Sequence, residues 1–125
     1  MVMEKKHMVS DAELEILEVL WKAGRALNAS EIRVRLEEKK NWERTTVLTL
    51  IRRLLDKGII IQEKQDVYYY HPILGREEYI RQETRSFVDK FFSGSSKNLA
   101  AALVSDERLS KEEIDELRNF FNKNI

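Results

Sequence analysis

The fold of this 125-residue chain is decided by residues 44–72, which read RTTVLTLIRRLLDKGIIIQEKQDVYYYHP. Apolar residues recur with the period of a helix over 44–57, which predicts an amphipathic helix that the next residue, a glycine, ends. Two runs of β-forming residues follow, 59–61 and 67–70, and the segment between them is polar. We predict that these runs pair as a β-hairpin whose second strand is ended by Pro72.

Helix starts elsewhere in the chain are marked by a repeated capping pattern. A Ser or Asn followed three residues later by Glu occurs as Ser10 and Glu13, Asn28 and Glu31, and Ser110 and Glu113. In such a capping box each side chain bonds a backbone N–H that the helix leaves without a partner. We therefore expect helices to start at residues 11, 29 and 111, and the first two to end near residues 23 and 39.

The order of these elements is helix, helix, helix, hairpin. This order is typical of a winged helix-turn-helix DNA-binding domain, which we place at residues 1–74. The predicted fold class is therefore mostly α, with the α+β arrangement of a winged helix and a helical domain after it.

The second part of the chain, residues 75–125, differs in composition because all five phenylalanines lie in it. We predict helices over 76–92 and 99–104 before the one that starts at 111. So short a segment cannot enclose a core around many large side chains, so we expect a second copy of the chain to cover them in a homodimer. The residues predicted at this dimerisation interface are Ile80, Phe87, Phe91, Leu99, Leu103, Ile114, Leu117, Phe120 and Phe121.

Composition excludes several classes of function. The chain has no cysteine, which excludes disulfides, thiolate nucleophiles and cysteine metal sites and fits the cytoplasm. No apolar run approaches the length of a membrane span, so we expect no membrane insertion. His7 and His71 have no ligand cluster beside them, and no catalytic constellation or phosphate-binding loop stands out. We expect neither an enzyme, nor a metal site, nor a cofactor.

Charge is balanced overall but uneven along the chain. Lysine plus arginine and aspartate plus glutamate number 22 each, yet residues 39–64 hold seven cations against three anions. The helix over 44–57 also carries short hydroxyl side chains on its outward face, a combination that suits double-stranded DNA. The predicted DNA-binding residues are Arg44, Thr45, Thr46, Leu48, Thr49, Arg52, Arg53 and, at the tip of the hairpin, Lys64.

Several of these features also have interpretations that do not involve a DNA operator. The outward helix face is also what an ordinary solvated helix presents, and winged helices serve as protein–protein modules without a specific operator. The run Tyr68-Tyr69-Tyr70 could stack on bases, although alternation along a strand favours packing against the core.

The ordered set of motifs resembles the penicillinase-repressor family, of the BlaI/MecI type, over residues 9–122. The matching motifs are Ser10-Asp11-Ala12-Glu13, Leu17, Trp21, Asn28-Ala29-Ser30-Glu31-Ile32, Thr46-Val47, Thr49, Arg53-Leu54, Lys57-Gly58, Lys97-Asn98-Leu99 and Leu109-Ser110-Lys111-Glu112-Glu113-Ile114-Asp115-Glu116-Leu117-Arg118. The resemblance implies a homodimeric repressor on a palindromic operator, with genes of β-lactam resistance or a related stress response as targets.

The resemblance also implies how repression is relieved. In that family a membrane-bound sensor metalloprotease leads to cleavage in the dimerisation domain, and the matching bond here joins Ala102 and Leu103. The family's pattern at that bond is Asn-Phe, from which this chain departs. It departs again at Leu48, where staphylococcal members carry an arginine. The copper-responsive branch of the family needs a cysteine cluster, which the absence of cysteine excludes.

Overall fold

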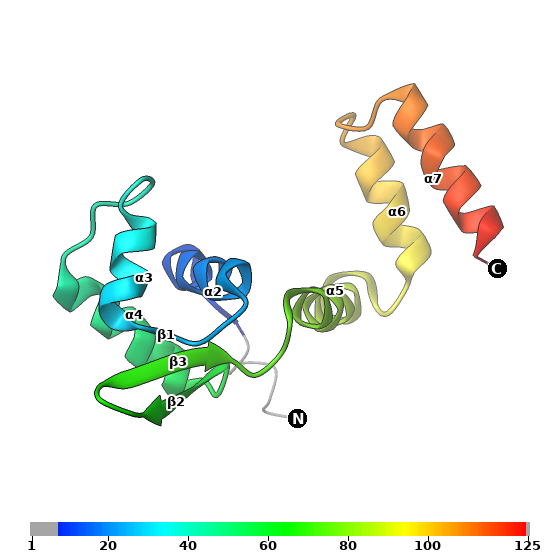
Figure 1. Ribbon diagram of the computed structural model, residues 1–125. Coiled ribbons are helices and arrows are strands. Elements are labelled where there is room, and N and C mark those ends of the chain that lie inside the picture. Colours follow the sequence, from blue (N-terminus) through cyan, green and yellow to red (C-terminus); the bar gives the residue numbers. More distant parts are fainter. Residues whose placement is uncertain (1–7, 125) are drawn as a thin grey trace. The chain divides into compact units, whose positions relative to one another are not determined.

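A computed structural model describes residues 8–124 of the chain (Figure 1). His7 and the rest of the N-terminal segment lie outside the described residues. The chain forms two compact units, Met1–Glu83 and Thr84–Ile125. The boundary that we predicted between residues 74 and 75 separates a DNA-binding part from a dimerisation part. That functional division stays a prediction.

The first unit is a winged helix-turn-helix, as predicted. Its elements are α2 (Asp11–Ala23), β1 (Leu27–Asn28), α3 (Ala29–Leu36), α4 (Arg44–Asp56), β2 (Ile60–Lys64) and β3 (Tyr68–Pro72). The strands form one antiparallel sheet in the order β1-β3-β2, and Figure 1 shows the three helices lying together on one side of it.

All three predicted capping boxes are present. In the first, the Glu13 amide donates to Ser10 Oγ at 3.1 Å and the Ser10 amide donates to Glu13 Oε1 at 2.9 Å. The boxes at Asn28 and Ser110 have the same reciprocal bonds. Gly58, predicted to stop α4, has φ of +73°, a left-handed conformation that side chains with a Cβ rarely adopt.

The core of the first unit lies between the helices and the sheet. Its buried hydrophobic residues are Ile16, Leu17, Leu20, Leu27, Ile32, Leu36, Val47, Leu50, Ile51, Leu54, Ile59, Ile60, Tyr70 and Tyr79. The core residues on α2, α3 and α4 recur every three or four positions, which is the spacing of one helix face. On α2, Ile16 is fully buried, whereas Leu14 and Trp21 are only partly buried.

Several predicted boundaries were wrong. The second helix ends at Leu36 rather than near 39, because the amides of Lys39 and Lys40 both turn back to the Leu36 carbonyl. The polar segment 62–66 is mostly strand, because its backbone pairs with β3 whatever its side chains are. The hairpin turn therefore lies later, where the Gln65 amide donates to the Val67 carbonyl at 2.9 Å.

The second unit contains the rest of α5 (Arg76–Phe92), followed by α6 (Ser96–Ser105) and α7 (Lys111–Lys123). The helix predicted over 99–104 is longer at its start, because Ser95 caps it by accepting from the Asn98 amide. Neither α6 nor α7 has a buried residue.

Candidate nucleic-acid interface

Helix α4 has two distinct faces. Val47, Leu50, Ile51 and Leu54 are buried in the core of the first unit. The opposite face is exposed along its whole length, and it holds the predicted residues Arg44, Thr45, Thr46, Leu48, Thr49, Arg52 and Arg53. The helix therefore projects a row of hydroxyl and guanidinium groups from a rigid base, and such groups bond phosphates and base edges in a major groove.

The hairpin forms a groove with the last turns of α4. This groove, about 590 Å³, is lined by Leu48, Thr49, Ile51, Arg52, Leu55, Asp56, Gln62, Tyr68 and Tyr70. The structure thus brings three of the predicted residues against the hairpin. Arg44, Thr45, Thr46, Arg53 and Lys64 do not line the groove.

Gln62 and Tyr68 line the groove but were not among the predicted DNA-binding residues. Strand register is the signal that reveals them, because Gln62 pairs with Tyr70 and Lys64 pairs with Tyr68, and directly paired residues share one face of a sheet. The prediction of core packing is right for Tyr70, which is buried, and wrong for Tyr68, which is exposed because the hairpin extends beyond the core.

The cations of the interface are available to an outside partner. Within residues 8–124, no ion pair includes Arg44, Arg52 or Arg53. Lys64 Nζ lies 5.2 Å from the ring centroid of Tyr68, so the aromatic ring steadies the side chain without neutralising it.

Thr49 has a hydroxyl that is already oriented by its own helix. Its Oγ1 donates to the Thr45 carbonyl at 2.9 Å. The hydroxyl proton is used in this bond, so the side chain offers lone pairs and a methyl group to a ligand. A base amino group or a thymine methyl group would suit that surface.

The C-terminal end of α4 is held by an ion pair between a partly exposed lysine and a buried glutamate, which sequence reasoning missed. Lys57 Nζ contacts Glu13 Oε1 at 2.5 Å, and it donates to the Met8 carbonyl at 2.8 Å. Burial favours the neutral carboxyl, but hydrogen bonds from Lys57 and the Ser10 amide and the charges of Lys57 and Arg53 outweigh it, so the pKa of Glu13 is lowered. The sequence signal was a carboxylate at an inward position, three residues before Ile16.

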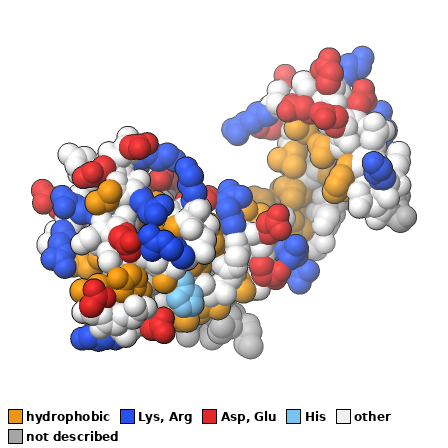
Figure 2. All heavy atoms as spheres, viewed as in Figure 1, with side chains coloured by type: hydrophobic (Ala, Val, Ile, Leu, Met, Phe, Trp, Pro, Cys, Tyr) orange, Lys and Arg blue, Asp and Glu red, His pale blue; other side chains and the backbone are white. Residues whose placement is uncertain are grey.

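The predicted dimerisation residues carry large exposed apolar surfaces. Exposed fractions are 47% for Phe87, 62% for Phe91 and 60% for Phe120. In the second unit, α6 and α7 form an apolar groove of about 360 Å³ that includes Leu103, Ile114, Leu117 and Phe121. Figure 2 shows hydrophobic side chains gathered between these two helices. Of the other predicted residues, Ile80 and Leu117 are 42% exposed and Leu99 is partly exposed.

The proposed cleavage bond lies inside α6. Ala102 and Leu103 are both exposed in the structure, and Leu103 is 51% exposed. Within the described residues, no helix has the length and apolar character needed to cross a bilayer. The same part of the chain holds no cluster of acidic or histidine side chains suited to a metal ion.

Three helices, a hairpin wing and an exposed, cation-bearing α4 define a protein of the winged helix-turn-helix class. Comparison with known proteins narrows this class, because the profile of the penicillinase repressor family matches residues 9–123. The chain belongs to the penicillinase repressor family. That is a family of transcriptional repressors, which confirms the prediction that this chain is not an enzyme.

Individual relatives match nearly the whole chain. The penicillinase repressor of Bacillus licheniformis is 33% identical over 92% of this chain and 90% of its own. The methicillin resistance regulatory protein MecI of Staphylococcus aureus is 32% identical over 95% of this chain and 97% of its own.

Two solved structures match the first part of the chain. The DNA-binding domain of the repressor BlaI has a TM-score of 0.51 at 33% identity, covering 58% of this chain and 88% of that one. Monomeric Bacillus licheniformis BlaI in complex with the blaP half-operator has a TM-score of 0.50 at the same identity and coverage. The winged-helix fold is thereby confirmed.

Proposed function

We propose that this chain is a homodimeric transcriptional repressor of β-lactam resistance or related stress genes, and that it binds a palindromic operator through α4. The observation that carries this proposal is the exposed face of α4, whose threonines and unpaired arginines project from a buried apolar base. The structural likeness to a BlaI monomer on a half-operator supports one winged helix per half-site.

The physical argument links one protomer to each half of the operator. A palindrome repeats its half-site with two-fold symmetry, and a homodimer has the same symmetry. Joining two weak half-site contacts raises the affinity by a factor of about 10²–10⁴ without any new contact. The dimer therefore supplies the affinity for the operator that one small domain lacks.

Selection of genomic fragments on the purified protein tests this function. We expect recovered fragments to share a palindrome next to genes of β-lactam resistance or a related stress response, and their retention to fall steeply with salt. Arg53→Ala should reduce retention, whereas Lys22→Ala, which removes an exposed cation from α2, should not. Recovery of fragments without a shared sequence would contradict an operator-binding role and favour the protein–protein module.

We further propose that repression is relieved by a cut between Ala102 and Leu103, made in response to a membrane-bound sensor protease. Exposure of both residues supports access to the bond in a separated chain. The cut would detach α7, and with it Leu117, Phe120 and Phe121, from the rest of the tail. Mass spectrometry of the protein recovered from its host after β-lactam exposure tests this. Intact protein in cells whose regulated genes are already active would rule the mechanism out.

A further inference from the structure

Leu48 interrupts the polar outer face of α4. Among the described residues of this helix, it is the only large hydrophobic residue that is exposed, and its exposed fraction is 36%. A single exposed apolar residue is ordinary on a protein surface. What Leu48 can contact therefore depends on the residues around it.

Leu48 lies between two arginines on the outer face of the helix. Arg44 and Arg52 are exposed, and they stand four residues before and four residues after it. Residues at this spacing form one row, with a rise of roughly 6 Å between neighbours. Within the part of the chain that the structure describes, neither arginine belongs to an ion pair. Free guanidinium groups bind phosphates, so double-stranded DNA is the partner whose charge complements this row.

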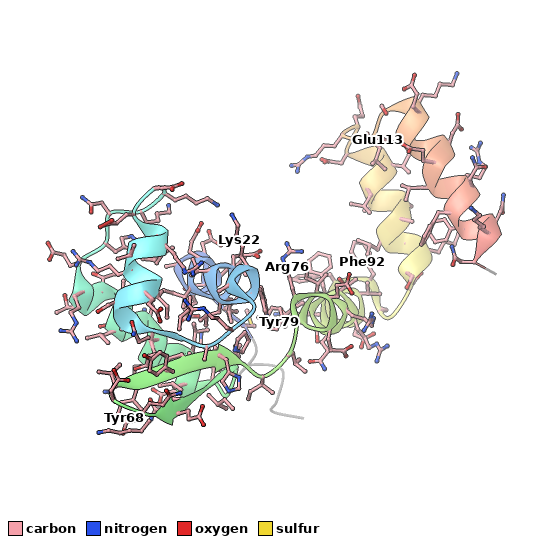
Figure 3. The ribbon with its side chains drawn as sticks, in the orientation of Figure 1. Lys22, Tyr68, Arg76, Tyr79, Phe92 and Glu113 are labelled. Carbon is pink, nitrogen blue, oxygen red and sulfur yellow. The ribbon has the colours of Figure 1, made fainter. Side chains whose placement is uncertain are left out.

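The neighbour of Leu48 adds a second apolar group. Leu48 and Thr49 both line the groove between α4 and the hairpin, together with Gln62 and Tyr68. Tyr68 lies near the tip of the hairpin (Figure 3). The hydroxyl proton of Thr49 is used within the helix, in the bond to the Thr45 carbonyl, and its methyl group is not. The DNA-facing side of α4 therefore has a small apolar spot between its cations.

The base edges in a major groove differ in one apolar group. Adenine, guanine and cytosine present only hydrogen-bonding groups there, whereas thymine adds a 5-methyl group beside its O4 acceptor. A leucine side chain has neither donor nor acceptor. Contact with the methyl group is therefore favourable, whereas contact with another base leaves polar groups of that base without a partner.

We propose that Leu48 is a specificity-determining residue that contacts the 5-methyl group of a thymine in the operator. The inference rests on the proposed function, since Leu48 meets base edges only when α4 enters the major groove. Arg44 and Arg52 bind the phosphate backbone, and Leu48 between them selects the base pair.

The alternative is that Leu48 only packs in the groove beside the hairpin and stabilises the fold. A packing residue changes the folded fraction, or the affinity for every duplex equally, and it does not respond to a methyl group on the DNA. A residue that reads thymine makes the affinity depend on that methyl group, and the dependence disappears when the leucine is replaced. The two roles are therefore separated by a ratio of affinities for two duplexes.

The test uses the full-length protein and the operator recovered by selection of genomic fragments. Each thymine of one half-site is replaced in turn by uracil, which lacks the 5-methyl group and keeps every hydrogen-bonding group. The variants are Leu48→Ala and Leu48→Gln, the second of which keeps a long side chain but makes its end polar. The matched control is Ile61→Ala. Ile61 is 43% exposed, and it precedes the groove residue Gln62 in β2, so it lies on the opposite face of the hairpin.

We expect one thymine at which uracil lowers the affinity of the wild type by about fourfold, the value of one buried methyl group. Ile61→Ala should show the same ratio, whereas Leu48→Ala and Leu48→Gln should bind the two duplexes equally. The inference alone is overturned if no thymine shows a methyl effect, if the effect persists in both Leu48 variants, or if Ile61→Ala also abolishes it. Absence of any specific binding by the wild type overturns the proposed function instead.

Discussion

At the scale of single residues, Glu13 has two structural roles. Its carboxylate completes the capping box of α2 through the Ser10 amide, and it pairs with Lys57 at the end of α4. The sequence predicted the first role, because the spacing from Ser10 is local. It could not predict the second, because the partner lies 44 residues away and becomes a neighbour only when α2 and α4 pack.

Removing the partner of this carboxylate should destabilise the protein. Lys57→Met leaves the carboxylate of Glu13, whose side chain is 2% exposed, with only its capping bond. Loss of a hydrogen-bond partner by a buried acceptor costs about 1–3 kcal/mol. Urea denaturation of the variant should give a lower midpoint than the wild type. Lys22→Met, which removes an exposed lysine of α2, is the matched control and should leave the midpoint unchanged. Equal midpoints for both variants would show that the ion pair adds nothing.

The same carboxylate makes stability depend on pH on the acid side. The pKa of Glu13 is lowered from 4.5 in the folded chain, so the unfolded state binds protons first as the pH falls. The stability that the Glu13 carboxylate adds is complete above about pH 4.5, and it is lost as the pH falls through the pKa that Glu13 has in the folded chain. Glu13→Gln should therefore flatten the loss of stability below pH 4.5, measured by urea denaturation at a series of pH values. A wild-type slope in this variant would assign the acid sensitivity to other carboxyls, such as Glu31, whose pKa is also lowered.

At the scale of elements, the periodic pattern predicted α2 and α4 well, because each buries one face and exposes the other. It missed β1, whose two residues, Leu27 and Asn28, are too few to show a period. The pairing of Leu27 with Tyr70 is a long-range contact that no local pattern encodes. The wing was predicted as a hairpin, but its turn was misplaced because polar side chains on an exposed strand resemble a loop.

Each arginine of α4 should make its own electrostatic contact to DNA, so replacing one arginine should remove one contact. Each phosphate contact adds about 0.9 to the slope of log affinity against log salt. Arg52→Ala and Arg53→Ala should each lower that slope by about one unit and weaken binding to specific and unrelated duplexes alike. Fluorescence anisotropy over a range of salt concentrations measures the slope. A slope that stays at the wild-type value in the double variant would place the DNA contacts elsewhere.

The threonines of α4 should act differently from its arginines. Thr46 and Thr49 are exposed short side chains on the proposed DNA-facing side, where direct contact with base edges discriminates by about 1–3 kcal/mol per contact. Replacing either with Gln should weaken operator binding more than binding to an unrelated duplex, with an unchanged salt slope. Competition titrations with both duplexes measure the ratio. An equal loss on both duplexes would assign the threonines to phosphate contacts or to neither.

At the scale of the whole molecule, the tail was predicted to need a second copy, and in the single chain its phenylalanines are indeed largely exposed. Composition could indicate that these side chains lack a partner, but it could not give the groove between α6 and α7, which depends on how the two helices pair. The homodimer itself stays a prediction, and it is supported by the apolar surface that a single chain leaves exposed.

Removing two large apolar groups from α7 should weaken that dimer. Burial of each phenylalanine is worth about 1.5–3 kcal/mol, so Phe120→Ser with Phe121→Ser should raise the dissociation constant of the dimer by at least a hundredfold. Sedimentation equilibrium measures this directly. The control is Arg118→Ala on the same helix, whose ion pair with Asp115 is exposed and worth little. An unchanged dimer in the double variant would place the interface outside α7.

The central claim is that two copies of the chain place one α4 in each half of a palindromic operator. Analytical ultracentrifugation of the full-length protein with a fluorescent operator duplex, read at the wavelength of the fluorophore, tests it most directly. The account predicts a complex of two chains per duplex that is lost with rising salt. A single chain on the full palindrome, or no complex at salt concentrations where the protein is dimeric, would contradict it.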